Sequence, residues 1–293
     1  MSHAGPDGFT RLRVAGPTRA RRFSNAAILS ACTVSTMVVV LPLTLIVSQL
    51  VMRGLPALKL SFFFNLPKPV GEPGGGMANA IVGTLILLGI GVVLAVPVGV
   101  ATGVYLSEYG RDRFASVVRY TADILSGVTS IIVGVATYGL IVVPMGRFSA
   151  IAGGVALGLL MLPLIVRTTE EVVRMVPLSY REAALALGAP HWSVIVQVVL
   201  PAALPGIMTA TMLSVARAAG ETAPLLFTAL GNRFGTVVLD RPIAALPLLI
   251  YDYARAPYSD WNRQAWTGAL VLLMLVTVVS AMVRLTTRRS PRP

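Results

Sequence analysis

Two opposite charges interrupt a strongly apolar stretch of this sequence. Arg217 and Glu221 lie near the middle of the run Leu204–Leu230, which carries no other ionisable side chain. An arginine at the centre of a membrane helix costs about 2.5–3.5 kcal/mol, so such a residue is a functional candidate. A guanidinium offers a planar fork of donors that matches a phosphate or carboxylate group. The pair therefore indicates an anion site, in which Glu221 either holds Arg217 when no anion is bound or accepts a proton from a protonated oxyanion.

A purely structural role for the same pair is the alternative. On a continuous helix, residues four positions apart share a face, so Arg217 and Glu221 would satisfy each other. The order of arginine before glutamate is the weaker orientation for such a pair. Both interpretations place the two side chains on one face of one helix.

A second informative stretch is the segment 177–201. Pro177 should interrupt the preceding helix, and Ser179 with Glu182 forms the S-x-x-E pattern of a capping box that begins a new one. Gly188 is placed to end this helix, and Pro190 suits the first turn of another short helix reaching Leu200. The pattern predicts two short helices joined by a glycine turn and lying along the membrane surface.

Several kinds of chemistry are missing from the sequence. It has no G-x-x-x-x-G-K-[ST] loop for ATP, no H-E-x-x-H metal motif and no G-x-S-x-G nucleophile elbow. His3 and His191 are too few and too isolated for a metal site. We therefore expect no enzyme activity and no cofactor on this chain, and any energy source must lie on another chain or in an ion gradient.

The composition indicates an integral membrane protein. Hydrophobic residues make up 55% of the chain and charged residues 12%, with a mean hydropathy of +0.78. Soluble domains carry roughly 25% charge. The excess of basic residues, 24 against 12 acidic, lies between apolar runs, which favours a role in membrane orientation over nucleic-acid binding.

Apolar segments long enough to cross a bilayer predict an all-α protein with six transmembrane helices, because spanning takes about 20 apolar residues and helices satisfy their own backbone. The predicted spans are Asn25–Met52, Asn79–Leu106, Val117–Pro144, Ile151–Val166, Leu204–Leu230 and Ala265–Leu285. Asp123 interrupts the third, and the fourth is short unless it continues past Arg167.

The distribution of arginines predicts the orientation of these helices. They gather in the tail of residues 1–24, after the second and fourth spans, and in the tail of residues 286–293. Six spans place all four clusters on one side, which the positive-inside rule makes the cytoplasm. Loops 53–78 and 231–264 then lie outside, and the second contains an apolar run, Ile243–Tyr253, that is too short to span.

The segment after the fourth span also carries a recognisable pattern. Glu182-Ala183-Ala184, three residues, Gly188, nine residues and then Val198-Val199-Leu200-Pro201 resembles the EAA motif of ABC-importer permeases, with Val198 in place of the usual isoleucine. A structured surface loop is the plainer interpretation. The resemblance implies instead a coupling helix that docks on an ATPase subunit, with Glu182, Ala183, Ala184 and Gly188 as its contact residues.

The charged string in the fifth span resembles a narrower group. Arg217-Ala218-Ala219-Gly220-Glu221-Thr222-Ala223-Pro224-Leu225 is similar to the R-A-x-G-E-T-A-P-L signature of phosphate-importer permeases. The strings 162–171 and 126–131 resemble the PstA-like subunits of that group, although relatives often carry proline where this chain has Thr129. The resemblance extends from about Asn79 to Leu285.

This resemblance implies roles for individual residues. Arg217 and Arg167 would face the translocation path, with Glu221 supporting Arg217, and Thr222 and Ser130 would offer hydroxyls there. Arg167 has a competing interpretation as an interfacial anchor whose side chain extends to the cytoplasm. Ser130 has one as well, because serine in a membrane helix commonly bonds its own backbone.

The resemblance as a whole implies one permease subunit of an ABC phosphate importer in the bacterial inner membrane, with the type I importer fold and both termini cytoplasmic. It implies a paralogous permease, two ATPase subunits and an extracytoplasmic phosphate-binding protein as partners. A permease for sulfate, molybdate or phosphonate is an alternative, since the EAA-like segment does not separate these substrates. An ion-coupled carrier or channel is another, and it would work without an ATPase.

Overall fold

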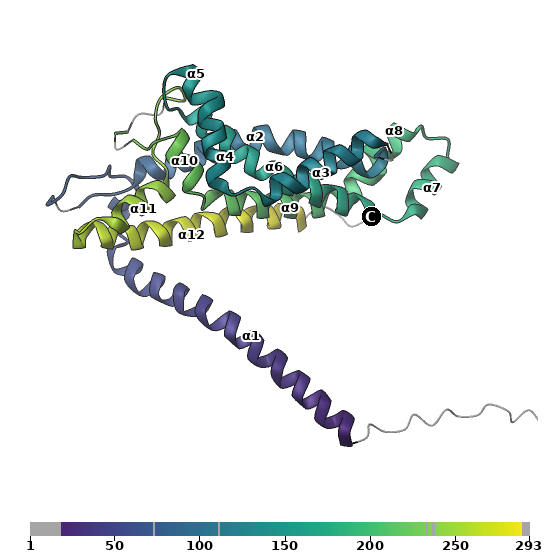
Figure 1. Cartoon of the computed structure of the whole chain (residues 1–293), viewed down its shortest axis with the longest axis horizontal. Coiled ribbons are helices and arrows are strands. Elements are labelled where there is room, and N and C mark those ends of the chain that lie inside the picture. Colours follow the sequence, from purple (N-terminus) through teal and green to yellow (C-terminus); the bar gives the residue numbers. More distant parts are fainter. Residues whose placement is uncertain (1–18, 73, 111, 233, 236–237, 289–293) are drawn as a thin grey trace, which may run out of the picture. The chain divides into compact units, whose positions relative to one another are not determined.

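The computed structural model describes residues 19–72, 74–110, 112–232, 234–235 and 238–288 (Figure 1). Regular structure in these ranges is helical, and the β contact they contain is an isolated bridge between Leu230 and Ile243. The chain divides into residues 1–49 and residues 50–293, and each unit is described by itself.

The first unit is most of helix α1, Arg19–Gly54. Every described side chain from Phe23 to Gln49 is exposed, and the sequence there is uncharged and mostly apolar. An apolar helix of this length is stable when its surface is buried in lipid or against other helices. The helix begins at Arg19, inside the stretch expected to be a tail.

Four further helices in the second unit have the length and composition of membrane spans. They are α2 (Ala78–Glu108), α6 (Ala150–Arg174), the run His191–Ala219 that ends in α9 (Leu200–Ala219), and α12 (Ser259–Arg288). With α1 they make five such helices among the described residues. The predicted fourth span is longer than Ile151–Val166, since α6 continues past Arg167 to Arg174.

The predicted third span is not one helix. Helix α3 (Arg113–Gly127) is followed by a helical run Ser130–Met145 at an angle of 106°. That run comprises α4 (Ser130–Thr137), a π turn (Tyr138–Val142) and α5 (Val143–Met145). Val128 and Thr129 have extended backbone, with ψ of 132° and 140°, so the chain turns there without a proline. Counted as one broken span, this pair brings the total to six.

The predicted fifth span, Leu204–Leu230, is also wrong in its bounds. Helix α9 ends at Ala219, and α10 (Ala223–Thr228) begins after Gly220–Thr222. At its other end, α9 continues back through a π segment, Ile195–Val199, into α8 (His191–Val194). The separate second surface helix expected up to Leu200 is therefore the first part of this span.

Helix α7 (Leu178–Ala186) is the short helix predicted in the EAA-like segment. It ends as expected: Gly188 has φ +81°, the Ala189 amide donates to Ala184 and the Gly188 amide to Leu185. This is a Schellman motif. The predicted capping box is wrong, because Pro177 occupies the N-cap position and no side chain caps the helix.

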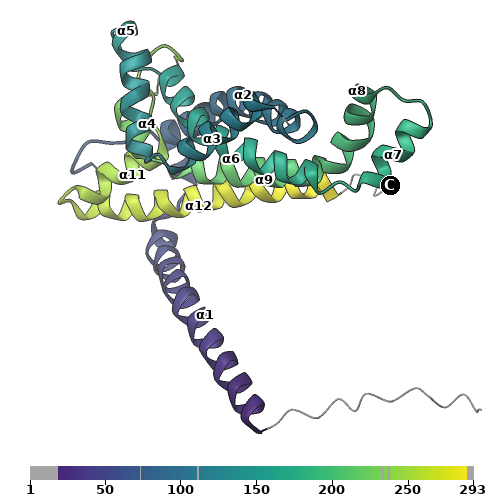
Figure 2. The ribbon, with the colours of Figure 1, turned by 45° about the vertical axis from the view of Figure 1, so that its right-hand side comes forward.

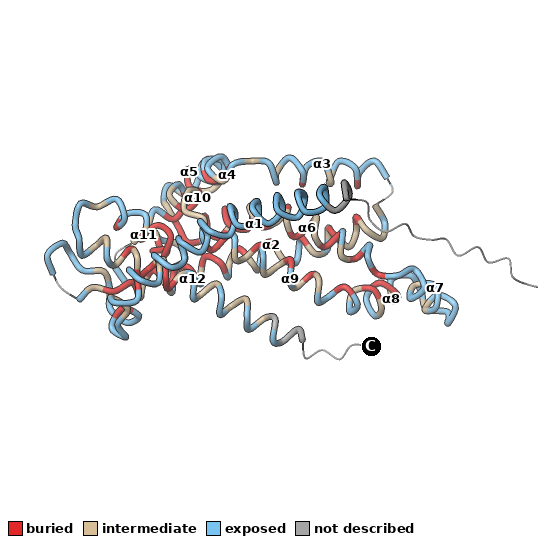
Figure 3. The backbone as a smooth tube through the Cα atoms, turned by 90° about the horizontal axis from the view of Figure 1, so that it is seen from below, coloured by how far each residue is buried: buried red, intermediate tan, exposed pale blue. Residues whose placement is uncertain are grey.

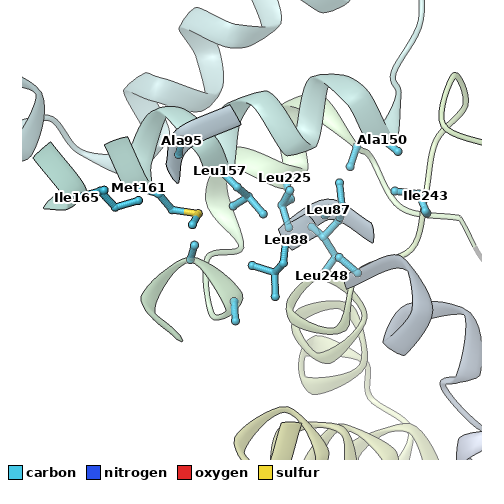
Figure 4. Packing of buried hydrophobic residues seen from close by; sticks show 14 residues of the cluster. Leu87, Leu88, Ala95, Ala150, Leu157, Met161, Ile165, Leu225, Ile243 and Leu248 are labelled. Carbon is cyan, nitrogen blue, oxygen red and sulfur yellow. The ribbon is translucent and has the colours of Figure 1, made fainter. Parts of the chain in front are cut away.

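The core of the second unit lies between α2 and α6. Figure 3 shows buried residues along α2, α6 and α9 and around α11, and Figure 4 shows Leu87, Leu157 and Leu225 packed together. Glycines permit the close approach of these helices: a Cβ at Gly103 would lie 2.6 Å from the Cβ of Thr169. Small residues serve this purpose in membrane bundles.

The run Ile243–Tyr253 forms a helix that does not span, as predicted. Helix α11 (Leu246–Arg255) buries Leu246, Leu249 and Tyr253, and Tyr253 stacks on Trp261 of α12 with ring centroids 4.5 Å apart. Within the second unit, α11 and α5 lie at one end and α7 and α8 at the other (Figures 1 and 2).

Candidate functional site

A small pocket lies where broken or proline-containing helices meet. Its volume is about 100 Å³, room for a few waters or a small ion. It is lined by the end of α3, by the part of α6 around Pro163, and by the end of α9. The lining residues are Leu125, Ser126, Val128, Leu160, Met161, Pro163, Leu164, Ser214, Arg217, Ala218 and Glu221.

Arg217 and Glu221 both line this pocket, although not as one helix face. Arg217 lies in the last turn of α9, and Glu221 lies beyond its end, after Gly220. No ion pair joins the two, and the side chain of Arg217, which is exposed, has no hydrogen bond or ion pair with any residue that the structure describes. The expected i, i+4 pair near the middle of a helix is therefore wrong, since the helix ends between the two residues.

The neutral polar groups of the pocket are already hydrogen-bonded. Ser126 Oγ donates to the Ala122 carbonyl at 2.9 Å, and Ser214 Oγ donates to the Met161 carbonyl at 3.2 Å. Neither serine was singled out in the sequence, where a hydroxyl in an apolar run gives little signal. Their hydroxyl protons are used within the protein, so the guanidinium of Arg217 supplies the available donors of the pocket.

Three other predicted site residues lie outside this pocket. Ser130 opens α4, just past the bend, and Thr222 borders a separate, apolar pocket of about 550 Å³ with α12. Arg167 is held in an ion pair, with its Nε 2.8 Å from Asp123. The structure thus brings together Arg217 and Glu221 alone among the predicted path residues.

Arg167 belongs to a charge cluster that the sequence did not predict. The centre of this cluster is Glu170, which is only 2% exposed. The Glu170 carboxylate lies 2.7 Å from Arg119, 2.5 Å from Arg174 and 3.6 Å from Arg167. Arg119 also donates to the carbonyls at the end of α2. This cluster joins α3, α6 and α2. The spacing of Arg167 and Glu170 on one helix was visible in the sequence, but Arg119 lies 51 positions from Glu170.

The chain matches a protein family and named relatives over most of its length. Residues 95–290 match the family "Binding-protein-dependent transport system inner membrane component". The chain is 42% identical over 266 residues to "Phosphate transport system permease protein PstA" of Haemophilus influenzae, covering 90% of this chain and 94% of that protein. The protein of the same name from Yersinia pestis is 43% identical, with 80% of each chain covered.

This chain belongs to the PstA family of inner-membrane permeases. The resemblance seen in the sequence is thereby confirmed, and the protein is a multi-pass permease subunit of the inner membrane. A solved structure with a similar fold is the "bacterial ABC transporter involved in the import of the acidic polysaccharide alginate", with a TM-score of 0.64 at 15% identity, covering 93% of this chain and 98% of that one. The predicted all-α, type I importer fold is confirmed.

The EAA-like segment of this permease presents an exposed surface. Glu182 and Ala183 are exposed, whereas Ala184 packs against the apolar cluster that contains Val173. Around them, Leu187 is 89% exposed and Trp192 64%. Leu187 follows the end of α7 and Trp192 lies at the start of the span His191–Ala219, and exposed apolar side chains gathered in this way are typical of a protein contact surface.

Proposed function

We propose that this chain forms half of the translocation path of an ATP-driven importer of inorganic phosphate. A paralogous permease completes the path, two ATPase subunits dock on the EAA-like segments, and an extracytoplasmic binding protein delivers phosphate. The names of the relatives and the missing ATP-binding loop support this assignment. Alternating access then follows from the different affinities of the partners for two states of the permease pair.

The observation that carries this proposal is the unpartnered Arg217 in the pocket. A phosphate ion that leaves water needs donors to replace its hydration, and a guanidinium provides them in a planar fork. Discontinuous membrane helices form substrate sites in many transporters. The pocket lies at two such breaks, α3–α4 and α9–α10, so the path can change shape there without unfolding a continuous helix.

Glu221 has a complementary role in the same proposal. Its carboxylate borders the pocket without an ion pair to Arg217. It limits how strongly Arg217 retains an anion, because like charges repel at short range. It also accepts a hydrogen bond from a phosphate oxygen that still carries a proton. Transport needs an anion to be released as well as bound, and this arrangement serves both steps.

The orientation of the chain is part of the proposal. The end of the second unit that carries α7 and α8 faces the cytoplasm, and the end that carries α5 and α11 faces outward. Both termini of the chain are cytoplasmic. The arginine distribution of the sequence supports this orientation. It places the EAA-like segment where ATP is available.

The test is labelled-phosphate uptake in cells that lack the native subunit. We predict that Arg217→Gln loses most uptake, at least about tenfold, because a charged hydrogen bond is worth about 1.5–3 kcal/mol. Arg217→Lys should retain part of it, since lysine keeps the charge and loses the planar fork. Membrane levels of each variant are measured alongside.

The matched control is Arg255→Gln, the same change at an exposed arginine that contacts Tyr251 at the end of α11. It should transport at the wild-type rate. Normal uptake by Arg217→Gln would contradict the proposal. Uptake of labelled sulfate or molybdate through this subunit, without uptake of labelled phosphate, would replace phosphate by another oxyanion as the substrate.

A further inference from the structure

Helix α7 touches the rest of the second unit through a narrow face. Of its nine residues, only Arg181 and Ala184 are not exposed. They are three positions apart and therefore lie on the same side of the helix. Ala184 contributes an apolar contact. Arg181 is the polar link between this helix and the membrane-spanning helices.

Arg181 reaches the ends of two of those helices. Its Nη2 lies 2.7 Å from Glu108 Oε1, on the last residue of α2, and donates to the Val173 carbonyl of α6 at 3.0 Å. Its Nη1 donates to the Val176 carbonyl at 3.2 Å, just beyond α6. The side chains of Arg181 and Glu108 are 16% and 7% exposed, so the pair is largely shielded from water.

Each helix end depends on this cation. A helix C-terminus has unpaired carbonyls and a partial negative charge, which an arginine nearby offsets. At α2 the problem is larger, because Glu108 adds a full negative charge to the unfavourable end of a helix. Losing Arg181 would leave Glu108 buried without a counter-charge, and such breaks weaken a structure strongly.

The two helices held by Arg181 lead directly to the pocket. Helix α6 lines it with Met161 and Pro163, and α2 packs closely along α6 over most of its length. When α7 moves, the contacts of Arg181 therefore displace the ends of α2 and α6. Helix α6 lines the pocket around Arg217, and α2 packs against α6.

We infer that Arg181, through Glu108 and the end of α6, is the positioning residue that transmits movement of α7 to the translocation path. This inference rests on the proposed function, in which α7 moves with an ATPase subunit. The opposite face of α7 contacts the ATPase, and Arg181 carries the displacement across the helix to the membrane part.

The experiment uses the complete transporter reconstituted in lipid vesicles. ATP hydrolysis, labelled-phosphate uptake and the amount of bound ATPase subunit are measured on the same preparation. Arg181→Gln should keep its ATPase subunits and hydrolyse ATP, while the phosphate moved per ATP falls about tenfold or more, since the buried Glu108 is left unpaired. Glu108→Gln should reduce the ratio less, because the contacts of Arg181 with the α6 carbonyls remain.

A double variant and a matched control sharpen the result. If both residues act through one contact, Arg181→Gln with Glu108→Gln should be no worse than Arg181→Gln alone. The control is Arg174→Gln, which breaks an ion pair with Glu170 inside a single helix and at a more exposed position. That pair links no moving parts, so the phosphate moved per ATP should equal the wild-type value.

Two results would overturn the inference. One is that Arg181→Gln moves as much phosphate per ATP as the wild type. If that variant fails to insert, the same result in Glu108→Gln would overturn the inference. The other is loss of the ATPase subunits from Arg181→Gln, which would make Arg181 a docking residue. A wild-type complex that hydrolyses ATP without moving phosphate would instead contradict the proposed function.

Discussion

At the scale of single residues, the cost of Arg217 demands an explanation. An unpaired arginine within a membrane segment is unfavourable by about 2.5–3.5 kcal/mol on insertion scales. Two other arginines, whose side chains are largely shielded from water, have acidic partners: Arg119 pairs with Glu170 and Arg181 with Glu108. Arg217 borders a pocket and has no such partner among the described residues. A transient anionic partner accounts for the difference.

Glu221→Gln is the residue-scale prediction. The change leaves the cation in place and removes a neighbouring negative charge, so we expect uptake to fall less than in Arg217→Gln. The apparent affinity for phosphate should rise or stay constant, because the repulsion of the anion is reduced. Initial uptake rates over a range of phosphate concentrations measure both quantities. A loss as complete as that of Arg217→Gln would show that the carboxylate itself is indispensable.

Residue types were easier to predict than their neighbours. Arg217 and Glu221 stood out because charges are rare in apolar runs, and both line the pocket. The prediction that the two residues share one face of a continuous helix was wrong. The helix breaks between them, at Gly220–Thr222, although the hydrophobicity of the sequence is continuous there. The partners of Arg167 and Arg181 lie 44 and 73 positions away. Such contacts depend on how the helices pack, and local patterns do not contain that information.

At the scale of elements, hydrophobicity predicts spans better than it predicts continuity. Four of the predicted spans correspond to long helices, whereas Val117–Pro144 and Leu204–Leu230 each cover a break. Hydropathy averages over a window and registers no turn at Thr129 or Thr222. Both breaks border the pocket, so the elements that the sequence described worst are those that form the candidate site.

Gly188 gives the element-scale prediction. Its φ of +81° suits glycine, and a Cβ there would meet no atom within 4 Å, so backbone strain is the obstacle to substitution. Gly188→Val should disturb the end of α7, at a cost of about 1–2 kcal/mol, and reduce both ATPase co-purification and uptake. Gly188→Asn is the matched control, because asparagine tolerates this conformation. Equal behaviour of the two variants would exclude a role for the glycine turn.

At the scale of the whole molecule, the second unit has a contact end and an opposite end. The EAA-like segment lies at one end and α11 at the other, and the pocket is bordered by the helices between them (Figures 1 and 2). This separation fits a permease that receives force at one end and substrate at the other. The distribution of arginines in the sequence predicts which end faces the cytoplasm. Chemical labelling of single cysteines tests this orientation.

Cysteine labelling with an impermeant reagent gives the topology prediction. In a Cys32→Ala background, Asp252→Cys on the exposed side of α11 should react in intact cells. Met175→Cys, at a residue that is 80% exposed beyond α6, should react only after lysis. Position 252 is preferable to Trp261, which stacks on Tyr253. The reverse pattern would invert the proposed orientation.

The central claim is that Arg217 carries the anion and is not merely the packing partner of Glu221. ATP-driven uptake of labelled phosphate by the variant Arg217→Gln/Glu221→Gln tests it most directly, in cells that lack the native subunit and with membrane levels checked. If the pair served packing alone, removing both charges would restore transport, since neither would be left unpaired. We predict that the double variant stays as inactive as Arg217→Gln. Near-normal uptake by the double variant would contradict the account.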